Sequence, residues 1–209
     1  HNTDKCHTHN FIRFYELYFA PMRNTAEKVL EIGILEGASM KLWKDYFKEA
    51  VIYGADILDC SHLDSDRLKT FIGDQSDRQH LAAMIEKFGS DFDIIIDDGG
   101  HWMNQQQISF GVLFQQLKPG GYYIIEDLHT SLTEFYPRGF EVNEDETNTT
   151  LGMLNDYIHT AKFHSEYLTE YEIDYITLNT ESVAIHHNVG DRQSILGVVK
   201  KRPKEAIPN

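Results

Sequence analysis

The chain has 209 residues, of which 41% are hydrophobic and 25% are charged, and its formal net charge is −14 at pH 7. These values predict a single soluble domain over residues 1–209, and a first residue His1 instead of Met is consistent with a domain of a longer protein. The acidic balance argues against nucleic acid and anionic membranes as partners. No signal peptide is expected from the sequence, and no apolar run reaches the length of a membrane span. The two distant cysteines, Cys6 and Cys60, favour a reduced, cytoplasmic setting.

Helices and strands are predicted to alternate through the first part of the chain. Aromatic residues at helical spacing predict a helix over 11–19. Buried strands are predicted at 28–34, 51–57, 69–74, 92–97 and 122–127. Helices are predicted at 39–50, 77–89 and 107–121, and the last is expected to stop at Pro119 and the two glycines after it.

After residue 127 the regular alternation of strands and helices is no longer predicted. A polar segment, 128–150, is predicted to be a mobile loop or lid, and a helix is expected near 150–165. Short strands are predicted around 172–178, 182–188 and 194–200. The whole pattern predicts a mostly parallel sheet with helices on both faces and an antiparallel C-terminal edge. Ligands of such sheets bind beyond the carboxyl ends of the strands.

The turn EIGILEGAS (31–39) follows the first predicted strand and indicates a nucleoside site. Gly33 and Gly37 allow a ligand close to the backbone at a helix start. Leu35 stands where a dinucleotide fingerprint has its second glycine, and Glu31 would repel a phosphate but attract a cation. Asp56, at the end of the next strand, can hold both ribose hydroxyls. A cationic nucleoside without phosphate, such as S-adenosylmethionine (SAM), fits; the alternative is a plain strand–turn–helix corner.

The segment GDQSD (73–77) ends the third strand and is expected on the adenine side of that nucleoside. The full set of candidate cofactor residues is Tyr15, Glu31, Gly33, Gly37, Ser39, Asp56, Ile57, Asp74, Gln75, Ser76 and Asp97.

Acidic residues end two consecutive strands, with Asp97 and Asp98 after one and Glu126 and Asp127 after the next. Carboxylates converging at one sheet edge favour Mg²⁺ or Mn²⁺ over zinc. The alternative is a structural use, in which the acids bind helix N-termini. His101, three residues after Asp98, favours a functional site.

Histidine has an unperturbed pKa suited to accepting a proton near neutrality. His101 is the first candidate base, although a lone histidine at a helix start is often only structural. His129, beside the second acidic pair, is a second candidate base or substrate contact. The other nine histidines are expected to have no such neighbourhood.

Three segments, VLEIGILEGASMKLW (29–43), IIIDDGGH (94–101) and GGYYIIEDLHTS (120–131), resemble class I SAM-dependent methyltransferases. More narrowly, they are similar to the metal-dependent sugar O-methyltransferases of the macrocin and mycinamicin type. The stretch TDKCHTHNFIRFYELYF resembles the T/S-D-K-G opening of that group, and the resemblance runs from about residue 3 to residue 131. The chain also resembles the methyltransferase domain of chlorovirus proteins that build capsid glycans.

The resemblance implies a Rossmann-like fold with a seven-stranded sheet, and methyl transfer from SAM to a hydroxyl of a sugar such as rhamnose. It implies Asp98, Glu126 and Asp127 as ligands of Mg²⁺ or Mn²⁺. It also implies His101 as the base, with Asp98 holding the reacting hydroxyl through the metal. Cys6 and Gly100 stand where the family usually has glycine and serine, and neither change removes a ligand.

Three other functions remain open, and the sequence does not predict the oligomeric state. A nicotinamide-dependent oxidoreductase would need the G-x-G-x-x-G fingerprint, and its short-chain members need Tyr-x-x-x-Lys; the chain has neither. A catechol-type methyltransferase would keep the cofactor and the metal but take a different acceptor, and the polar segment 128–150 favours a sugar. A non-catalytic SAM-binding domain would have no need of the acids and His101.

Overall fold

The computed structural model describes residues 1, 3–136, 139–188 and 194–204. The helices are α1 (Asp4–His7), α2 (Ile12–Phe19), α3 (Ala38–Tyr46), α4 (Arg78–Phe88), α5 (Met103–Leu113), α6 (Thr150–Thr160) and α7 (Glu170–Asn179). Short 3₁₀ helices are η1 (Ala20–Met22), η2 (Ser61–Leu63), η3 (Phe114–Gln116) and η4 (Leu128–Ser131). The strands are β1 (Lys28–Ile32), β2 (Val51–Asp56), β3 (Leu68–Ile72), β4 (Phe92–Asp97), β5 (Leu117–Ile125), β6 (Thr180–Asn188) and β7 (Ser194–Lys201).

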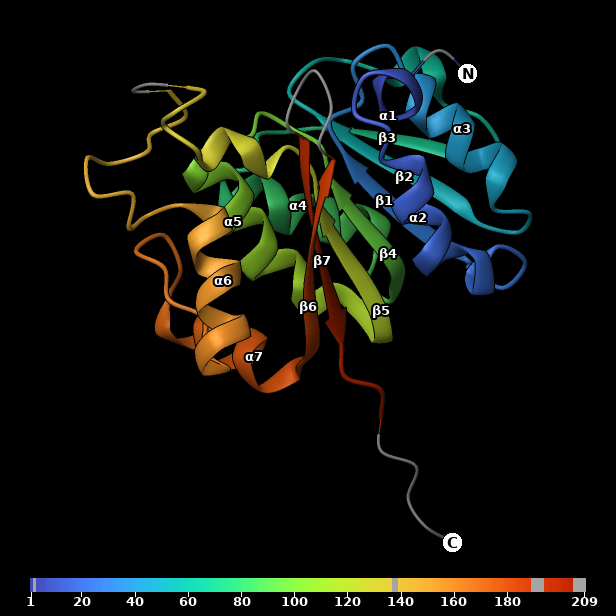
Figure 1. Cartoon of the computed structure of the whole chain (residues 1–209). Helices are drawn as coiled ribbons and strands as arrows, with labels where there is room; N and C mark the ends of the chain where they lie inside the picture. Colours follow the sequence, from blue (N-terminus) through green and yellow to red (C-terminus); the bar gives the residue numbers. More distant parts are fainter. Residues whose placement is uncertain (2, 137–138, 189–193, 205–209) are drawn as a thin grey trace, which may run out of the picture.

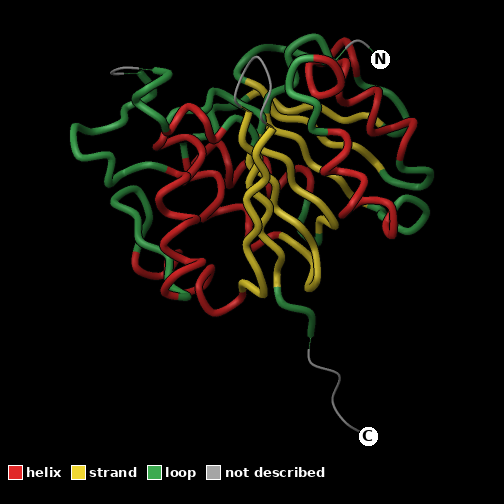
Figure 2. The backbone as a smooth tube through the Cα atoms, viewed as in Figure 1, coloured by secondary structure: helices red, strands yellow, loops and turns green. Residues whose placement is uncertain are grey.

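One seven-stranded sheet joins these strands in the order β3-β2-β1-β4-β5-β7-β6. Strands β1 to β5 run parallel, whereas β7 is antiparallel to both of its neighbours. Helices α2 and α3 lie on one side of the sheet and α5 to α7 on the other (Figure 1), and Figure 2 shows the strands between the two groups. The fold class predicted from the sequence is confirmed.

The sheet separates two hydrophobic cores, because successive side chains of a strand point to opposite faces. Leu30 of β1 belongs to the core that contains Phe110 of α5. Its neighbour Val29 belongs to the core that contains Trp43 of α3. The strand order reverses between β1 and β4, so the loops after these two strands diverge and leave a crevice at their carboxyl ends.

Two predicted elements are wrong. Residues 172–178 lie in α7 and not in a strand, because Thr169 and Glu172 cap that helix reciprocally, the Thr169 N–H donating to Glu172 at 2.8 Å. The helix expected over 107–121 ends at Leu113, and Leu117 already begins β5, with an irregularity that accommodates Pro119.

The segment 128–150 begins with the buried turn η4 and is held further along by Asn148, whose side chain donates to the Glu141 carbonyl at 2.7 Å. A lid function for it stays a prediction. Among the described residues, no helix has the length and hydropathy to cross a membrane.

Candidate active site

A cavity of about 690 Å³ opens at the carboxyl ends of the parallel strands. Its walls come from the turns after β1, β2, β3 and β4, from Asp127 after β5, and from Thr3, Asp4 and Thr8 in or beside α1. Such a volume is typical of a small-molecule site. Residues 3–8 are not among the site residues predicted from the sequence.

Six of the predicted cofactor residues line this cavity, namely Gly33, Ser39, Asp56, Ile57, Asp74 and Gln75. Asp56 ties the turn after β1 to the end of β2, because its Oδ2 accepts from the N–H groups of Ile34 at 2.7 Å and Leu35 at 3.1 Å. Contact between Asp56 and a ribose stays a prediction.

The structure does not place the other five on the cavity wall; these are Tyr15, Glu31, Gly37, Ser76 and Asp97. Glu31 is fully buried, and Ser39 Oγ donates to its Oε2 at 2.8 Å. Tyr15 is also buried and donates to Glu126. A direct cofactor contact by these five residues remains a prediction, and their observed partners are other protein groups.

Asp97 is buried beneath the glycine turn after β4 and supports it through hydrogen bonds. Its carboxylate accepts from Ser109 and from Gln75 Nε2 at 3.0 Å, and Gln75 Oε1 accepts from the Gly100 N–H at 3.0 Å. Burial raises the pKa of Asp97 to about 6. The paired acids after β4 therefore differ, since Asp97 supports the turn and Asp98 reaches the cavity.

Gly33 is required by close packing as well as by conformation. Its φ is +87°, and a Cβ there would lie 2.0 Å from the Asp98 carbonyl oxygen. We expect Gly33→Ala to lower the free energy of unfolding by about 3 kcal/mol or more and to displace Asp98. Gly120→Ala is the matched control, because φ is +84° there and nothing lies within 4 Å of an added Cβ. Urea unfolding of both variants checks this, and equal losses would contradict it.

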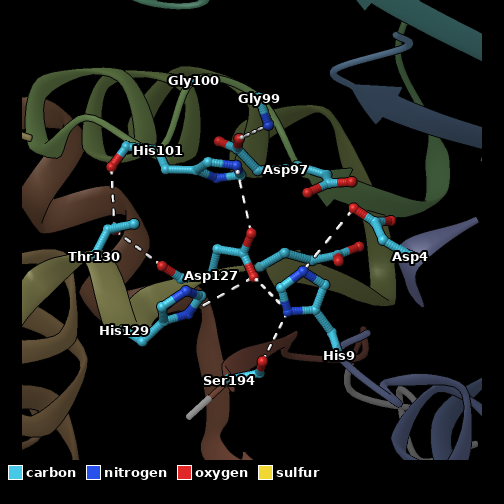
Figure 3. Close-up of polar contacts among 12 residues, drawn as sticks. Asp4, His9, Asp97, Gly99, Gly100, His101, Asp127, His129, Thr130 and Ser194 are labelled. Carbon is cyan, nitrogen blue, oxygen red and sulfur yellow. Dashed lines mark hydrogen bonds and ion pairs between the residues drawn. The ribbon is translucent and has the colours of Figure 1, made fainter. Parts of the chain in front are cut away.

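Three histidines surround Asp127 (Figure 3). His101 Nε2 lies 3.5 Å from Asp127 Oδ2, whereas His9 Nδ1 and His129 Nδ1 lie 3.5 and 3.7 Å from Oδ1. His9 also shares a hydrogen bond of 2.7 Å with Ser194 Oγ. The expectation that no histidine besides His101 and His129 has an acidic neighbourhood is therefore wrong for His9.

Thr130 fixes the two left-handed residues of this cluster. His101 and Asp127 have φ values of +60° and +55°. The Thr130 hydroxyl lies within hydrogen-bonding distance of the carbonyl oxygens of both, at 3.3 and 2.9 Å. Non-glycine residues in this conformation are uncommon and often occur at functional sites.

The charge of this cluster favours a bound cation. Burial, and then the nearby Asp98, raise the pKa of Asp127 to about 7. Burial lowers the pKa of His101, and it lowers that of His129 to about 4, so both rings are neutral at pH 7. Asp127 Oδ1 is buried and has no hydrogen-bond partner among the described residues. Asp98, His101 and Asp127 offer ligand atoms within 4.8 Å of one another, and this donor set fits a hard divalent ion.

Glu126 is buried and does not line the cavity, unlike Asp98 and Asp127, the other two predicted ligands. Its Oε1 accepts from Lys5 Nζ at 2.6 Å and from Tyr15. Burial, together with Asp98, raises the pKa of Glu126 well above its usual value. Burial alone would lower the pKa of Lys5, but Asp98, Glu126 and Glu31 outweigh it and raise that pKa. Metal ligation by Glu126 stays a prediction.

No protein-family model matches the chain. The chain is 37% identical over 175 residues to the 8-demethyl-8-alpha-L-rhamnosyl tetracenomycin-C 2'-O-methyltransferase of Streptomyces olivaceus, covering 79% of this chain and 45% of the relative. It is 36% identical over 193 residues to the mycinamicin VI 2''-O-methyltransferase of Micromonospora griseorubida, covering 87% and 47%. The chain thus spans about half the length of the curated relatives it matches.

A solved structure of the MycE methyltransferase with Mg, SAH and mycinamycin VI matches with a TM-score of 0.77 and 31% identity, covering 97% of this chain and 53% of that one. The sheet order and the cavity at its carboxyl edge define the class I methyltransferase fold. Within that class, the chain is a homologue of the sugar O-methyltransferases of the mycinamicin and tetracenomycin type over the matched residues.

Proposed function

We propose that the chain transfers a methyl group from SAM to a hydroxyl of a sugar, with Mg²⁺ or Mn²⁺ as a second cofactor. The observation that carries this proposal is that one cavity is lined both by the Gly33 turn with Asp56 and by Asp98, His101 and Asp127. The names of the relatives support a sugar acceptor, and the Mg and SAH bound to MycE support the two cofactors.

The residues of the chain divide the reaction between them. Asp98 and Asp127 would hold the divalent ion, which lowers the pKa of a hydroxyl when bound. His101 is neutral at pH 7 because burial lowers its pKa, so it accepts the hydroxyl proton on a ring nitrogen. The hydroxyl oxygen then bonds to the methyl carbon as the carbon–sulfur bond breaks, leaving S-adenosylhomocysteine. Charge is neutralised in this step, so a cavity that excludes water favours it.

Aromatic side chains beside His129 support a sugar as the acceptor. The ring of Tyr136 lies 5.7 Å from that of His129 and 5.2 Å from that of Phe140, and Phe140 contacts Trp102 at 6.1 Å. Trp102 and Tyr136 remain 44% and 37% exposed. Flat apolar rings with polar edges suit a sugar, whose ring faces carry C–H groups and whose rim carries hydroxyls.

Calorimetry tests the cofactor part of the proposal. We expect SAM and S-adenosylhomocysteine to bind, and NAD to bind far more weakly, because the turn after β1 has Leu35 where a pyrophosphate site needs glycine. Tighter binding of NAD than of SAM would exclude the methyltransferase function.

A transfer assay with tritiated-methyl SAM tests the acceptor. Rhamnosides and related deoxysugar glycosides are expected to be methylated, and catechols are not. Methylation of catechols alone would assign the chain to the catechol-type alternative, whereas SAM binding without any transfer would indicate a binding domain.

We also propose a cytoplasmic location. Cys6 and Cys60 form no disulfide, which is the state expected in a reducing compartment. Fractionation of cells that express the protein tests this.

A further inference from the structure

Lys5 is a buried cation in the acidic cluster, and the proposed mechanism gives it no role. It lies in α1 and its side chain has no exposed surface. Its Nζ donates to Asp98 and to Glu126 Oε1 at 2.6 Å, and it lies 3.4 Å from Glu31 Oε1. One ammonium group therefore contacts carboxylates from β1 and from the ends of β4 and β5.

Two of the acids that Lys5 contacts differ in their surroundings: Glu31 is enclosed by protein groups, whereas Asp98 lines the cavity. Glu31 is satisfied inside the protein, because Ser39 Oγ donates to it at 2.8 Å and Trp43 Nε1 at 3.2 Å. Asp98 instead lies between Lys5 and the cavity, where Asp127 offers a further ligand oxygen. Asp98 is therefore shared between the buried ammonium group and any cation that enters the cavity.

We infer that Lys5 is a positioning residue that acts as an internal counter-ion, competes with the divalent metal for Asp98, and so limits the affinity for that metal. The inference rests on the metal site of the proposed function. Two cations drawn to the same carboxylates repel each other at short range. Without a metal, the ammonium group compensates buried carboxylates that would otherwise be unpaired, which is costly. Lys5 thus stabilises the metal-free protein and weakens metal binding.

Lys5→Met tests the inference without any measurement of activity. Mn²⁺ is titrated into the protein in the presence of saturating S-adenosylhomocysteine, and free Mn²⁺ is followed by its paramagnetic resonance signal. We expect the Kd for Mn²⁺ to fall by about tenfold or more. We also expect the Tm of the metal-free variant to fall by roughly 5 to 10 °C, and Mn²⁺ to raise it by more than in the wild type.

Lys201→Met is the matched control. Lys201 is also buried, but its ammonium group donates to the backbone carbonyls of Phe114, Gln115 and Leu117. Its replacement is expected to lower the Tm and to leave the Kd for Mn²⁺ unchanged. Mn²⁺ binding by Lys5→Met that is equal to or weaker than wild type overturns the inference. If neither protein binds Mn²⁺, the proposed metal site fails and the inference fails with it.

A second pair of variants covers the case in which Lys5→Met does not fold. Lys5→Met/Glu31→Gln removes one acid together with the ammonium group, and so preserves the charge balance of the cluster. We expect it to bind Mn²⁺ about tenfold more tightly than Glu31→Gln alone. Equal affinities of these two proteins would overturn the inference.

Discussion

Chelation with EDTA is expected to abolish methyl transfer, and Mg²⁺ or Mn²⁺ is expected to restore it. Asp98, Asp127 and His101 place ligand atoms within 4.8 Å of one another, and Asp98 helps to raise the pKa of Asp127 to about 7. A sugar hydroxyl without a bound cation keeps a pKa far above neutrality, so its proton is not readily lost. Asp98→Asn is expected to lower turnover by more than about a hundredfold, because losing even an outer-shell partner of a metal ligand costs 10- to 100-fold.

Initial rates at several metal concentrations measure this effect. Asp66→Asn is a suitable control, because Asp66 is an exposed carboxylate that pairs with Lys44. Glu126→Gln has a separate use: a large rise in the Kd for Mn²⁺ would identify Glu126 as a ligand, and a small change would leave it as a partner of Lys5 and Tyr15. Full activity in thoroughly chelated protein would show that the acids do not act through a metal.

Replacing His101 is expected to cut turnover by about a hundredfold or more while SAM affinity stays nearly unchanged, since a positioned base contributes about 10²- to 10⁴-fold. The Kd for Mn²⁺ separates this role from ligation: it should stay nearly unchanged if His101 is the base, and a clear rise would make the ring a third ligand beside Asp98 and Asp127. His101 lines the cavity, and its Nε2 lies 3.5 Å from Asp127. Some activity should survive at high pH, because the bound metal still acidifies the hydroxyl.

The expected pH dependence of turnover follows from the lowered pKa of His101. Burial lowers the pKa of His101 below the usual 6.5, so the ring stays neutral as the pH falls to that value. At saturating metal, which keeps Asp127 ionised, wild-type turnover is therefore expected to hold at pH 6.5 and to decline only at lower pH. Steady-state kinetics from pH 5 to 9 measure this decline, and the variant should lack it.

Two variants separate the side chain from the backbone. His101 has φ of +60°, which asparagine tolerates better than alanine does, so His101→Asn controls for strain in His101→Ala. Both variants should lose turnover alike. Near-normal turnover at neutral pH in both would reduce His101 to a structural residue and make His129 the next candidate base.

The sheet could be predicted because its signals are local. Apolar runs such as FDIIID mark buried strands, and the acids that follow them mark the carboxyl edge where the cavity opens. The strand expected at 172–178 failed because the capping pair Thr169 and Glu172 outweighed the alternating apolar residues. Sequence periodicity alone cannot decide between such competing local signals.

The acidic part of the site was predicted because its residues lie at or shortly after the ends of strands. Asp98, His101 and Asp127 are such residues, and the structure brings them together. Lys5 and His9 were missed because their partners lie far along the chain, with Lys5 and Glu126 separated by 121 residues. Glu31 was expected to attract a cationic ligand, and its observed cationic partner is Lys5. Only the TDK opening, noted for its resemblance, pointed to that segment.

The separations within this site also determine when it can form during folding. Lys5 reaches Glu126 across 121 residues, and His9 reaches Ser194 across 185. Lys5 and His9 leave the ribosome well before these partners, and they remain without them until β5 and then β7 have been synthesised and paired. Contacts this distant in sequence slow folding, since the loop must close before they contribute. The candidate site is consequently expected to assemble last, after the sheet that supports it.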